Sequence, residues 1–440
     1  MSAEAAEEKV DAAEPEENRH WETKDGEQWV VLACVPLVVR GNYFSPGIEN
    51  KIKAAKAPRA TRLVVHRSIA PRTKTIYDHP YVAGADCHGR LLLYATLGYE
   101  LKPSLVLDAF YSKPAPPFDH RGVPEAYFIC DTRTHKSTRL NDHGFHNFHP
   151  GNAGLASLTE DMYVVADLNP GVGTDRASLL IYSSGSGNWE EHMVDYPPHH
   201  RPWGSNGVVV HQTIIWWVDL SYGLLACDLR IEPHNLRFVP LPEGCEMPPS
   251  TPDLDRRRCV GFRGGDLRYM QIHERVFDGK PIVSMWTLID QDAGTWRHDC
   301  EVLVKDIWDD KGYKATKLPR EVPTAALIHP EHPGDVAYFF LHSRLFGVDL
   351  AARRVLEWQF FQMLHPPSAY HSSRFVRAWK RSISSANDDT GSVEQKKDDP
   401  PPPVRRTRKR PTKYLWIRTR DTRLKDRRRK DPRCRGTRRP

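Results

Sequence analysis

The sequence predicts an all-β protein, a β-propeller-like array of about five or six blades built from antiparallel hairpins. Three observations support this fold class: a recurring hairpin unit, many turn residues, and little amphipathic helix. The 440 residues include 28 Gly and 36 Pro, a content that argues against a helical bundle. They also include 12 Trp, 16 Tyr and 15 Phe, which is too much aromatic material for a wholly disordered chain.

The recurring unit is an apolar run, a polar turn and a second segment that often ends on Trp or Leu. Runs rich in Val, Ile, Leu and aromatic residues favour strands, and Gly, Asn and Asp between them suit tight turns. Repeats of roughly 40–50 residues, each a small antiparallel sheet, are typical of propellers. We identify six copies, at residues 90–97, 127–140, 179–189, 223–242, 283–296 and 344–358.

Further strands are expected before three of these hairpins, at residues 162–166, 207–219 and 336–341, as four-stranded blades require. Helix is expected only as a turn or two, in short stretches such as Thr324–Ile328 or Phe375–Arg381. A sandwich of two sheets would use similar hairpins and remains an alternative.

Composition divides the chain into three parts. Residues 1–27 hold ten acids and three bases, and we expect this segment to be disordered. Residues 28–382 are the expected propeller-like domain. Residues 383–440 are the expected linker and disordered basic tail, with a stiff tetraproline at Pro400–Pro403. The net charge of +7 comes from residues 404–440, where 18 Lys and Arg stand against three Asp.

No basic, apolar leader opens the sequence, and the longest apolar run, Val30–Val39, is too short for a membrane span. The eight cysteines form no C-x-x-C pair and show no zinc-finger spacing. We therefore expect a soluble protein without a membrane partner, in the cytoplasm or the nucleus, whose cysteines are small buried residues in a reducing compartment.

A longer motif covers residues 216–229, WWVDLSYGLLACDL, followed by LRFVPLP at 236–242 and by Trp286-Thr-Leu288 further on. This pattern resembles domain of unknown function 1618, which occurs in many grass proteins. The resemblance is best over residues 207–350 and looser from Trp29 onward, and the chain departs from the family pattern between about Pro36 and Lys74. It implies a plant protein whose fold is similar to F-box-associated propellers, although we find no F-box here. It implies no activity.

The motif residues fit structural roles. Trp216 and Trp217 should point to opposite faces of a strand, and Asp219 and Gly223 should bracket a turn. A catalytic carboxylate pair, Asp219 with Asp228, is the alternative. The motif residues expected to be structural are Trp217, Asp219, Gly223, Cys227, Asp228, Pro240, Pro242, Trp286 and Trp296.

Candidate chemistry is sparse. His143, His146 and His149 suit a metal only if their loop curls, and an exposed loop is the simpler interpretation. Residues 290–296 resemble the Asp-box turn of sialidase-like propellers, which is itself structural. We find no nucleotide-binding loop and no nucleophile elbow. The sequence therefore predicts no catalytic residue, no cofactor and no metal.

The basic tail is the strongest electrostatic feature. Its first cluster, a candidate nuclear-import or phosphate-binding signal, consists of Arg405, Arg406, Arg408, Lys409 and Arg410. A solvated extension is the alternative. We expect a non-catalytic protein-interaction module whose loop face binds a protein partner. The alternatives are a carbohydrate-active enzyme with converging carboxylates in a central pocket, and a nuclear protein that contacts nucleic acid through the tail.

Overall fold

The structure is a computed structural model that describes nine stretches of the chain: residues 27–39, 43–70, 80–96, 125–141, 152–171, 173–197, 201–249, 251–361 and 376–382. Apart from Glu27, the acidic first segment lies outside these residues, as does the basic tail. No helix in the described stretches is long and apolar enough to cross a membrane.

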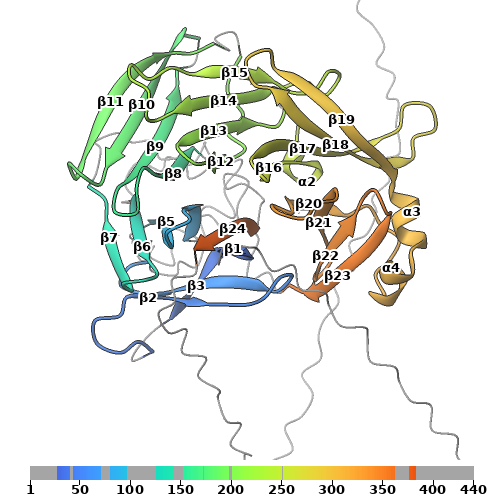
Figure 1. Ribbon diagram of the computed structural model, residues 1–440, viewed down its shortest axis with the longest axis horizontal. Helices are drawn as coiled ribbons and strands as arrows, with labels where there is room; N and C mark the ends of the chain where they lie inside the picture. Colours follow the sequence, from blue (N-terminus) through green and yellow to red (C-terminus); the bar gives the residue numbers. More distant parts are fainter. Residues whose placement is uncertain are drawn as a thin grey trace, which may run out of the picture. The chain divides into compact units, whose positions relative to one another are not determined.

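The described chain forms a six-bladed β-propeller, which confirms the predicted fold class (Figure 1). Each blade is a four-stranded sheet, and its innermost strand faces the ring axis. These inner strands are β4 (Tyr81–Ala85), β8 (Ala153–Ser157), β12 (Val208–His211), β16 (Arg258–Arg263), β20 (Thr324–Ile328) and β24 (Val376–Ser382).

In five blades the chain runs from the inner strand outward through three antiparallel neighbours. The turns between them use the residues that the sequence pattern singles out; Gly294, for example, has a φ of 63° in the turn 290–296. The outer strands are β5 (Arg90–Thr96), β6 (Glu125–Asp131), β7 (Lys136–Arg139), β9 (Tyr163–Pro170), β10 (Arg176–Ser183), β11 (Asn188–Asp195), β13 (Ile214–Asp219), β14 (Gly223–Asp228), β15 (Arg237–Pro240), β17 (Asp266–Glu274), β18 (Pro281–Asp290), β19 (Thr295–Leu303), β21 (Val336–Leu341), β22 (Arg344–Asp349) and β23 (Arg354–Phe360).

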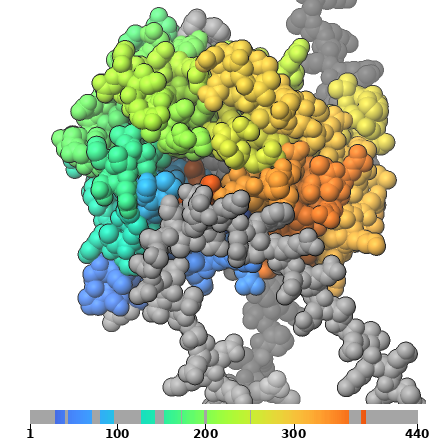
Figure 2. Space-filling view, in the orientation of Figure 1, coloured from blue at the N-terminus to red at the C-terminus, as the bar shows by residue number. Residues whose placement is uncertain are grey.

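The sixth blade joins the two ends of the described chain. Its order is β2-β3-β1-β24, from β1 (Glu27–Val39), β2 (Asn50–Lys53), β3 (Ala60–His66) and the last strand. Strand β24 pairs antiparallel with β1, whereas β1 and β3 are parallel. The blue strands of this sixth blade therefore lie beside the orange fifth blade in the space-filling view (Figure 2).

The predicted hairpins are the outer pairs of strands in their blades. Residues 127–140, 179–189, 223–242, 283–296 and 344–358 become β6–β7, β10–β11, β14–β15, β18–β19 and β22–β23. The looser copy at 90–97 is β5, in the same blade as 127–140, so six copies account for five blades.

The two expected helical stretches are wrong. Thr324–Ile328 is strand β20, and Phe375–Arg381 falls mainly on strand β24. Both are inner strands packed between neighbouring blades, so their apolar residues do not show the alternation of a half-exposed strand. Within the described stretches, three short helices lie instead in connections: α2 (Leu254–Arg257), α3 (Val304–Asp309) and α4 (Lys311–Ala315).

The core lies between the blades. Trp217 packs with residues of the preceding blade, such as Leu168, and its Nε1 donates to the Asn152 carbonyl at 2.6 Å. Trp216, on the opposite face, packs with Tyr269 of the following blade. The two tryptophans thus lie on opposite faces of β13, as predicted from the sequence, and the structure shows that they fill adjacent inter-blade layers.

We expect Trp379→Ala to lower the free energy of unfolding by about 3–5 kcal/mol, because large-to-small changes at buried aromatic residues leave a cavity. Trp379 in β24 is 2% exposed and packs against the β4 blade, where its Nε1 donates to the Asp86 carbonyl at 2.7 Å. Urea denaturation of the purified chain measures the loss.

Trp358→Ala is the matched control, since Trp358 on outer strand β23 is 37% exposed and should cost less than about 1 kcal/mol. Equal losses in the two variants would contradict the closure of the ring through β24.

Candidate functional site

An axial cavity of about 350 Å³ runs between the inner strands of all six blades. Its walls are mostly small or aliphatic side chains, because inner strands that converge on an axis leave little room for large ones. Glycine also lets neighbouring inner strands lie close together, because a Cβ on Gly154 would be only 2.9 Å from Cγ1 of Val208. The cavity is the main concave feature that the fold builds from every blade.

The described cavity wall holds one carboxylate, Asp86. The Asp86 side chain is 2% exposed and pairs with Arg90 Nη1 at 3.0 Å. Its Oδ2 also accepts from the Ser157 hydroxyl at 2.7 Å. Its lone pairs are therefore engaged within the protein. Glycosidases of the usual type need two carboxylates facing the bond that they cleave, and the described wall does not provide them.

The remaining polar groups of the wall are mainly cationic or neutral. Strand β24 contributes Arg377 and Lys380, and other blades contribute His88, His211 and Gln212. Lys380 Nζ pairs with Glu331 at 3.0 Å. Burial, and to a smaller extent the nearby charge of Lys380, lowers the pKa of His211, whose ring stacks on Phe262 at 4.7 Å. His211 is therefore an uncharged imidazole at neutral pH.

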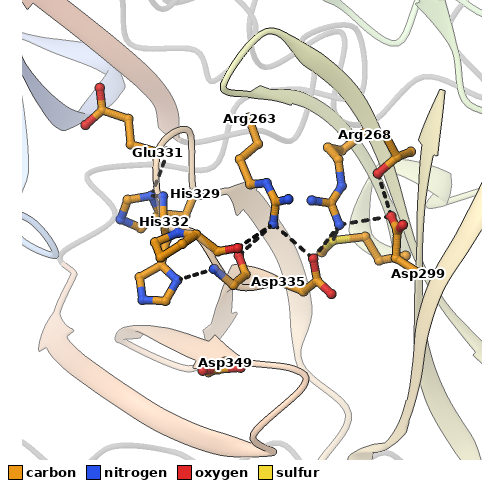
Figure 3. Close-up of polar contacts among 12 residues, drawn as sticks. Arg263, Arg268, Asp299, His329, Glu331, His332, Asp335 and Asp349 are labelled. Atoms are coloured by element: carbon orange, nitrogen blue, oxygen red, sulfur yellow. Dashed lines mark hydrogen bonds and ion pairs between the residues drawn. The ribbon is translucent and has the colours of Figure 1, made fainter. Parts of the chain in front are cut away.

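A buried polar network joins the fourth and fifth blades (Figure 3). Arg268 on β17 is 1% exposed at its side chain, and its Nη2 lies 3.0 Å from Asp299 Oδ2 and 2.6 Å from Asp335 Oδ1. Arg263 Nη1 also contacts Asp335 at 3.1 Å. The Nε and Nη1 atoms of Arg268 are buried without a hydrogen-bond partner. The network links the blades electrostatically around the buried Arg268 side chain, while Arg263 and Asp335 remain partly exposed.

The turn before β21 supports this network. His329 Nδ1 accepts hydrogen bonds from the backbone N–H groups of Glu331 and His332 at 3.1 and 2.9 Å. Burial, with a smaller effect of His332, lowers the pKa of His329 to about 3. A neutral ring that accepts backbone N–H groups shapes a turn and does not suit proton transfer near neutral pH. The described residues contain no group of three or more His, Cys, Asp or Glu placed to hold a metal.

A third feature lies at the outer edge of the fifth blade. Strand β23 ends its sheet and exposes Leu356, Trp358 and Phe360, which are 37, 37 and 55% exposed. Trp358 and Phe360 are alternate residues and share one face of the strand. Leu356 lies beside them at an irregularity in the strand pairing, and the three exposed side chains form an apolar row. The Arg344 guanidinium lies 4.8 Å from the Trp358 ring and 5.8 Å from the Phe360 ring.

Asp219 occupies the buried end of β13 and shapes a turn there. Its carboxylate accepts from the Ser221 and Gly204 backbone N–H groups, each at 2.8 Å. Asp228 ends β14 and accepts from Thr213 and Arg230. Because β13 and β14 are antiparallel and Asp228 pairs in register with Ile214, the two aspartates lie at opposite ends of the hairpin. The structure separates the carboxylates that a catalytic pair would bring together.

The other motif residues lie in packing positions. A Cβ on Gly223 would lie 2.6 Å from the Phe238 ring, and Cys227 is buried in the layer of Trp217. Trp296 Nε1 donates to the Pro240 carbonyl at 2.8 Å, and the Trp286 ring lies 5.5 Å from the Tyr269 ring. Pro242 is buried, and its carbonyl accepts from the Cys245 N–H at 2.9 Å.

Several sequence predictions lie outside the described residues: the histidines His143, His146 and His149, and the basic cluster 405–410. The structure also shows groups that the sequence did not indicate as site residues. They are Arg377, Lys380, the Arg268 network and the β23 row. Only the β23 row has a signal in the sequence, since apolar residues alternate at Leu356, Trp358 and Phe360, at and just beyond the end of the hairpin predicted at 344–358.

Fold and site together define a six-bladed β-propeller with a largely apolar axial cavity. The family described as "Protein of unknown function (DUF1618)" matches residues 217–338, from β13 into β21. The predicted resemblance to this family is thereby confirmed over the central blades. No curated protein sequence matches the chain.

Solved propellers resemble the chain at low identity. A chain in the crystal structure of the mitotic checkpoint complex is 10% identical, with 82% of this chain and 76% of that chain covered and a TM-score of 0.32. The Myceliophteria thermophila Cps50 (Swd1) propeller domain is 9% identical, with 71% of this chain and 100% of that chain covered and a TM-score of 0.32. Penicillium chrysogenum α-L-arabinanase, complexed with arabinobiose, is 11% identical, with 73% of this chain and 82% of that chain covered and a TM-score of 0.30. Likeness at this level carries no argument about function.

We expect Asp335→Ala to lower the free energy of unfolding by about 3 kcal/mol, because it removes one of the two carboxylates that neutralise buried Arg268. Asp292→Ala, which breaks the exposed pair of Arg237 with the 87% exposed Asp292, should cost less than about 1 kcal/mol. Urea denaturation of both variants tests the difference. Similar losses would show that the Arg268 network does not stabilise the blade junction.

A second prediction concerns Asp167 on β9, which is 5% exposed and accepts from the Tyr127 hydroxyl of the preceding blade at 3.2 Å. Burial raises the pKa of Asp167 to about 7, against the smaller opposite effect of that hydrogen bond. The folded state therefore binds this proton more tightly than the unfolded state does. As pH rises from about 4 through about 7, Asp167 progressively lowers the free energy of unfolding.

Asp167→Asn removes this titration, and its stability relative to wild type should rise by about 2–3 kcal/mol between pH 5 and pH 8. Urea denaturation at both pH values measures the change. Asp175→Asn, at an exposed turn, should leave the pH profile unaltered. A wild-type profile as flat as that of Asp167→Asn would contradict the buried, protonated carboxyl.

Proposed function

We propose that this chain is a non-catalytic protein-interaction module, and that the outer edge of its fifth blade binds an extended segment of a partner protein. The observation that carries the proposal is the apolar row Leu356, Trp358 and Phe360 on edge strand β23. An edge strand offers unpaired backbone groups, and exposed apolar side chains along it add affinity for an incoming strand.

The outer strands of three other blades differ from this edge. The exposed positions of outer strand β2 are Lys51 and Lys53, and those of β19 are Thr295, Arg297, His298 and Glu301. Strand β7 likewise exposes Lys136, Thr138 and Arg139. Polar and charged side chains on an edge prevent strand addition, so the row on β23 lacks the protection that these blades have.

The partner should be an extended segment with alternating apolar and acidic residues. Arg344 lies over the aromatic rings of the row, and Arg354 is exposed at the start of the same strand. These two cations complement carboxylates on an incoming strand, and the row complements its apolar side chains. Helix α4 packs against β23 near Val355, whose N–H donates to Asp310 Oδ2 at 3.0 Å. The segment should therefore pair along the remaining part, toward Phe360.

A carbohydrate-active enzyme on the same scaffold is the alternative, and the axial cavity gives it less support. The one carboxylate of the described wall, Asp86, is engaged by Arg90 and Ser157. Contact with nucleic acid through the basic cluster 405–410 stays a prediction from the sequence.

Photo-crosslinking tests the proposal directly. With p-benzoylphenylalanine in place of Trp358, we expect a discrete crosslinked protein from an extract of the source cells. The same amino acid in place of Arg297, on outer strand β19, should not capture it. Once that protein is identified and purified, the double variant Leu356→Ser/Phe360→Ser should weaken its binding at least tenfold, because two of the three apolar contacts are lost.

The folding of the double variant is checked by its urea denaturation midpoint, which should remain close to that of wild type since both side chains are exposed. Identical crosslinks at positions 358 and 297, or undiminished binding by the double variant, would refute the proposal. A crosslink only to a second copy of this chain would also refute it, in favour of self-association.

A further inference from the structure

Arg377 is a cation placed in the apolar wall of the axial cavity. It lies on inner strand β24, opposite Leu32 of β1, and it lines the cavity with small residues of other blades such as Gly154 and Ala326. Lys380 lies three residues further along the same strand, about 10 Å away along the axis. The two charges are therefore at different depths.

The charge of Arg377 is not neutralised within the described residues. No ion pair or side-chain hydrogen bond of Arg377 is found there, and its Nε is buried without a hydrogen-bond partner. Asp86 and Lys380, which also line the wall, are engaged elsewhere, since Asp86 binds Arg90 and Lys380 binds Glu331. An unpaired guanidinium among apolar groups is unfavourable, and an anion brought to it gains a strong, charge-assisted pair of hydrogen bonds.

We propose that the axial cavity binds a small amphipathic organic anion, with a carboxylate or phosphate head on Arg377 and an apolar body against the inner strands. The volume of about 350 Å³ is within the range of small-molecule sites, and a mostly apolar wall with few polar groups is typical of them. This site is separate from the β23 edge, so its existence does not depend on the proposed protein interaction.

The anionic head would bind the planar guanidinium in a bidentate manner, which a carboxylate and a phosphate monoester both permit. Neutral His211 and aromatic Phe262 lie in the wall near Lys380 and suit an aromatic body. The ligand therefore needs one anionic group and one apolar ring or chain of moderate size.

Isothermal titration calorimetry with the purified full chain tests the site. The probes are phenylacetate and phenyl phosphate, with phenylacetamide as the neutral match for phenylacetate. We expect saturable binding of at least one anion, at least tenfold tighter than that of phenylacetamide. Arg377→Met should weaken anion binding at least tenfold, whereas Arg139→Met, which removes the same charge from an exposed position of outer strand β7, should leave it unchanged.

Two further measurements separate a binding role from a structural one. Without ligand, Arg377→Met should unfold at the same temperature as wild type or higher, since it removes an unneutralised charge; a structural arginine would lower that temperature. Ala378→Trp, at an exposed position of the cavity wall, should abolish anion binding by filling the cavity while Arg377 remains. Equal binding of anion and amide, or undiminished binding by Arg377→Met or Ala378→Trp, would overturn the proposal.

Discussion

Closure of the ring by the last strand is the constraint on which the rest of the structure depends. Strand β24 pairs with β1 from Glu27–Ser382 to Ala33–Val376, so residues about 350 positions apart become neighbours. A propeller blade is apolar on both faces, and an open ring would leave the faces at the gap exposed to water. Closure also completes the axial cavity, because β24 supplies one of its six walls and brings Arg377 into it. The fold and the proposed anion site thus share one strand.

Apolar packing between blades is non-directional, and a few hydrogen bonds between blades specify how one blade is placed on the next. Each of them joins a side chain of one blade to a group of its neighbour, so it holds only in one relative position. The pairs are Trp379 with Asp86, Tyr127 with Asp167, Trp217 with Asn152, Trp296 with Pro240, and Arg268 with Asp335. The family motif contributes two of these tryptophans, which explains in physical terms why the motif residues are spread over successive blades.

Sequence reasoning succeeded where solvent imposes a pattern. The outer hairpins were predicted because half-exposed strands alternate apolar and polar residues and their turns need Gly, Asn or Asp. It failed for β20 and β24, whose residues contact blades on both sides and follow no such alternation. Arg377 and Lys380 were missed for the same reason, since they lie in a segment interpreted as a helical turn. No local pattern indicates the pairing of β1 with β24, because that contact exists only when the ring is complete.

The two proposed surfaces lie at opposite edges of the propeller sheets, and this arrangement argues that they act independently. The fifth blade contributes to both, with Leu327 of β20 in the cavity wall and Trp358 of β23 at the outer edge. Three strand spacings of about 4.8 Å separate these edges, bridged by continuous backbone ladders. A signal between them would need a register shift in that sheet, which would turn its buried side chains to the wrong face. The continuous sheet of this blade therefore separates the two proposed surfaces and provides no structural route that couples them.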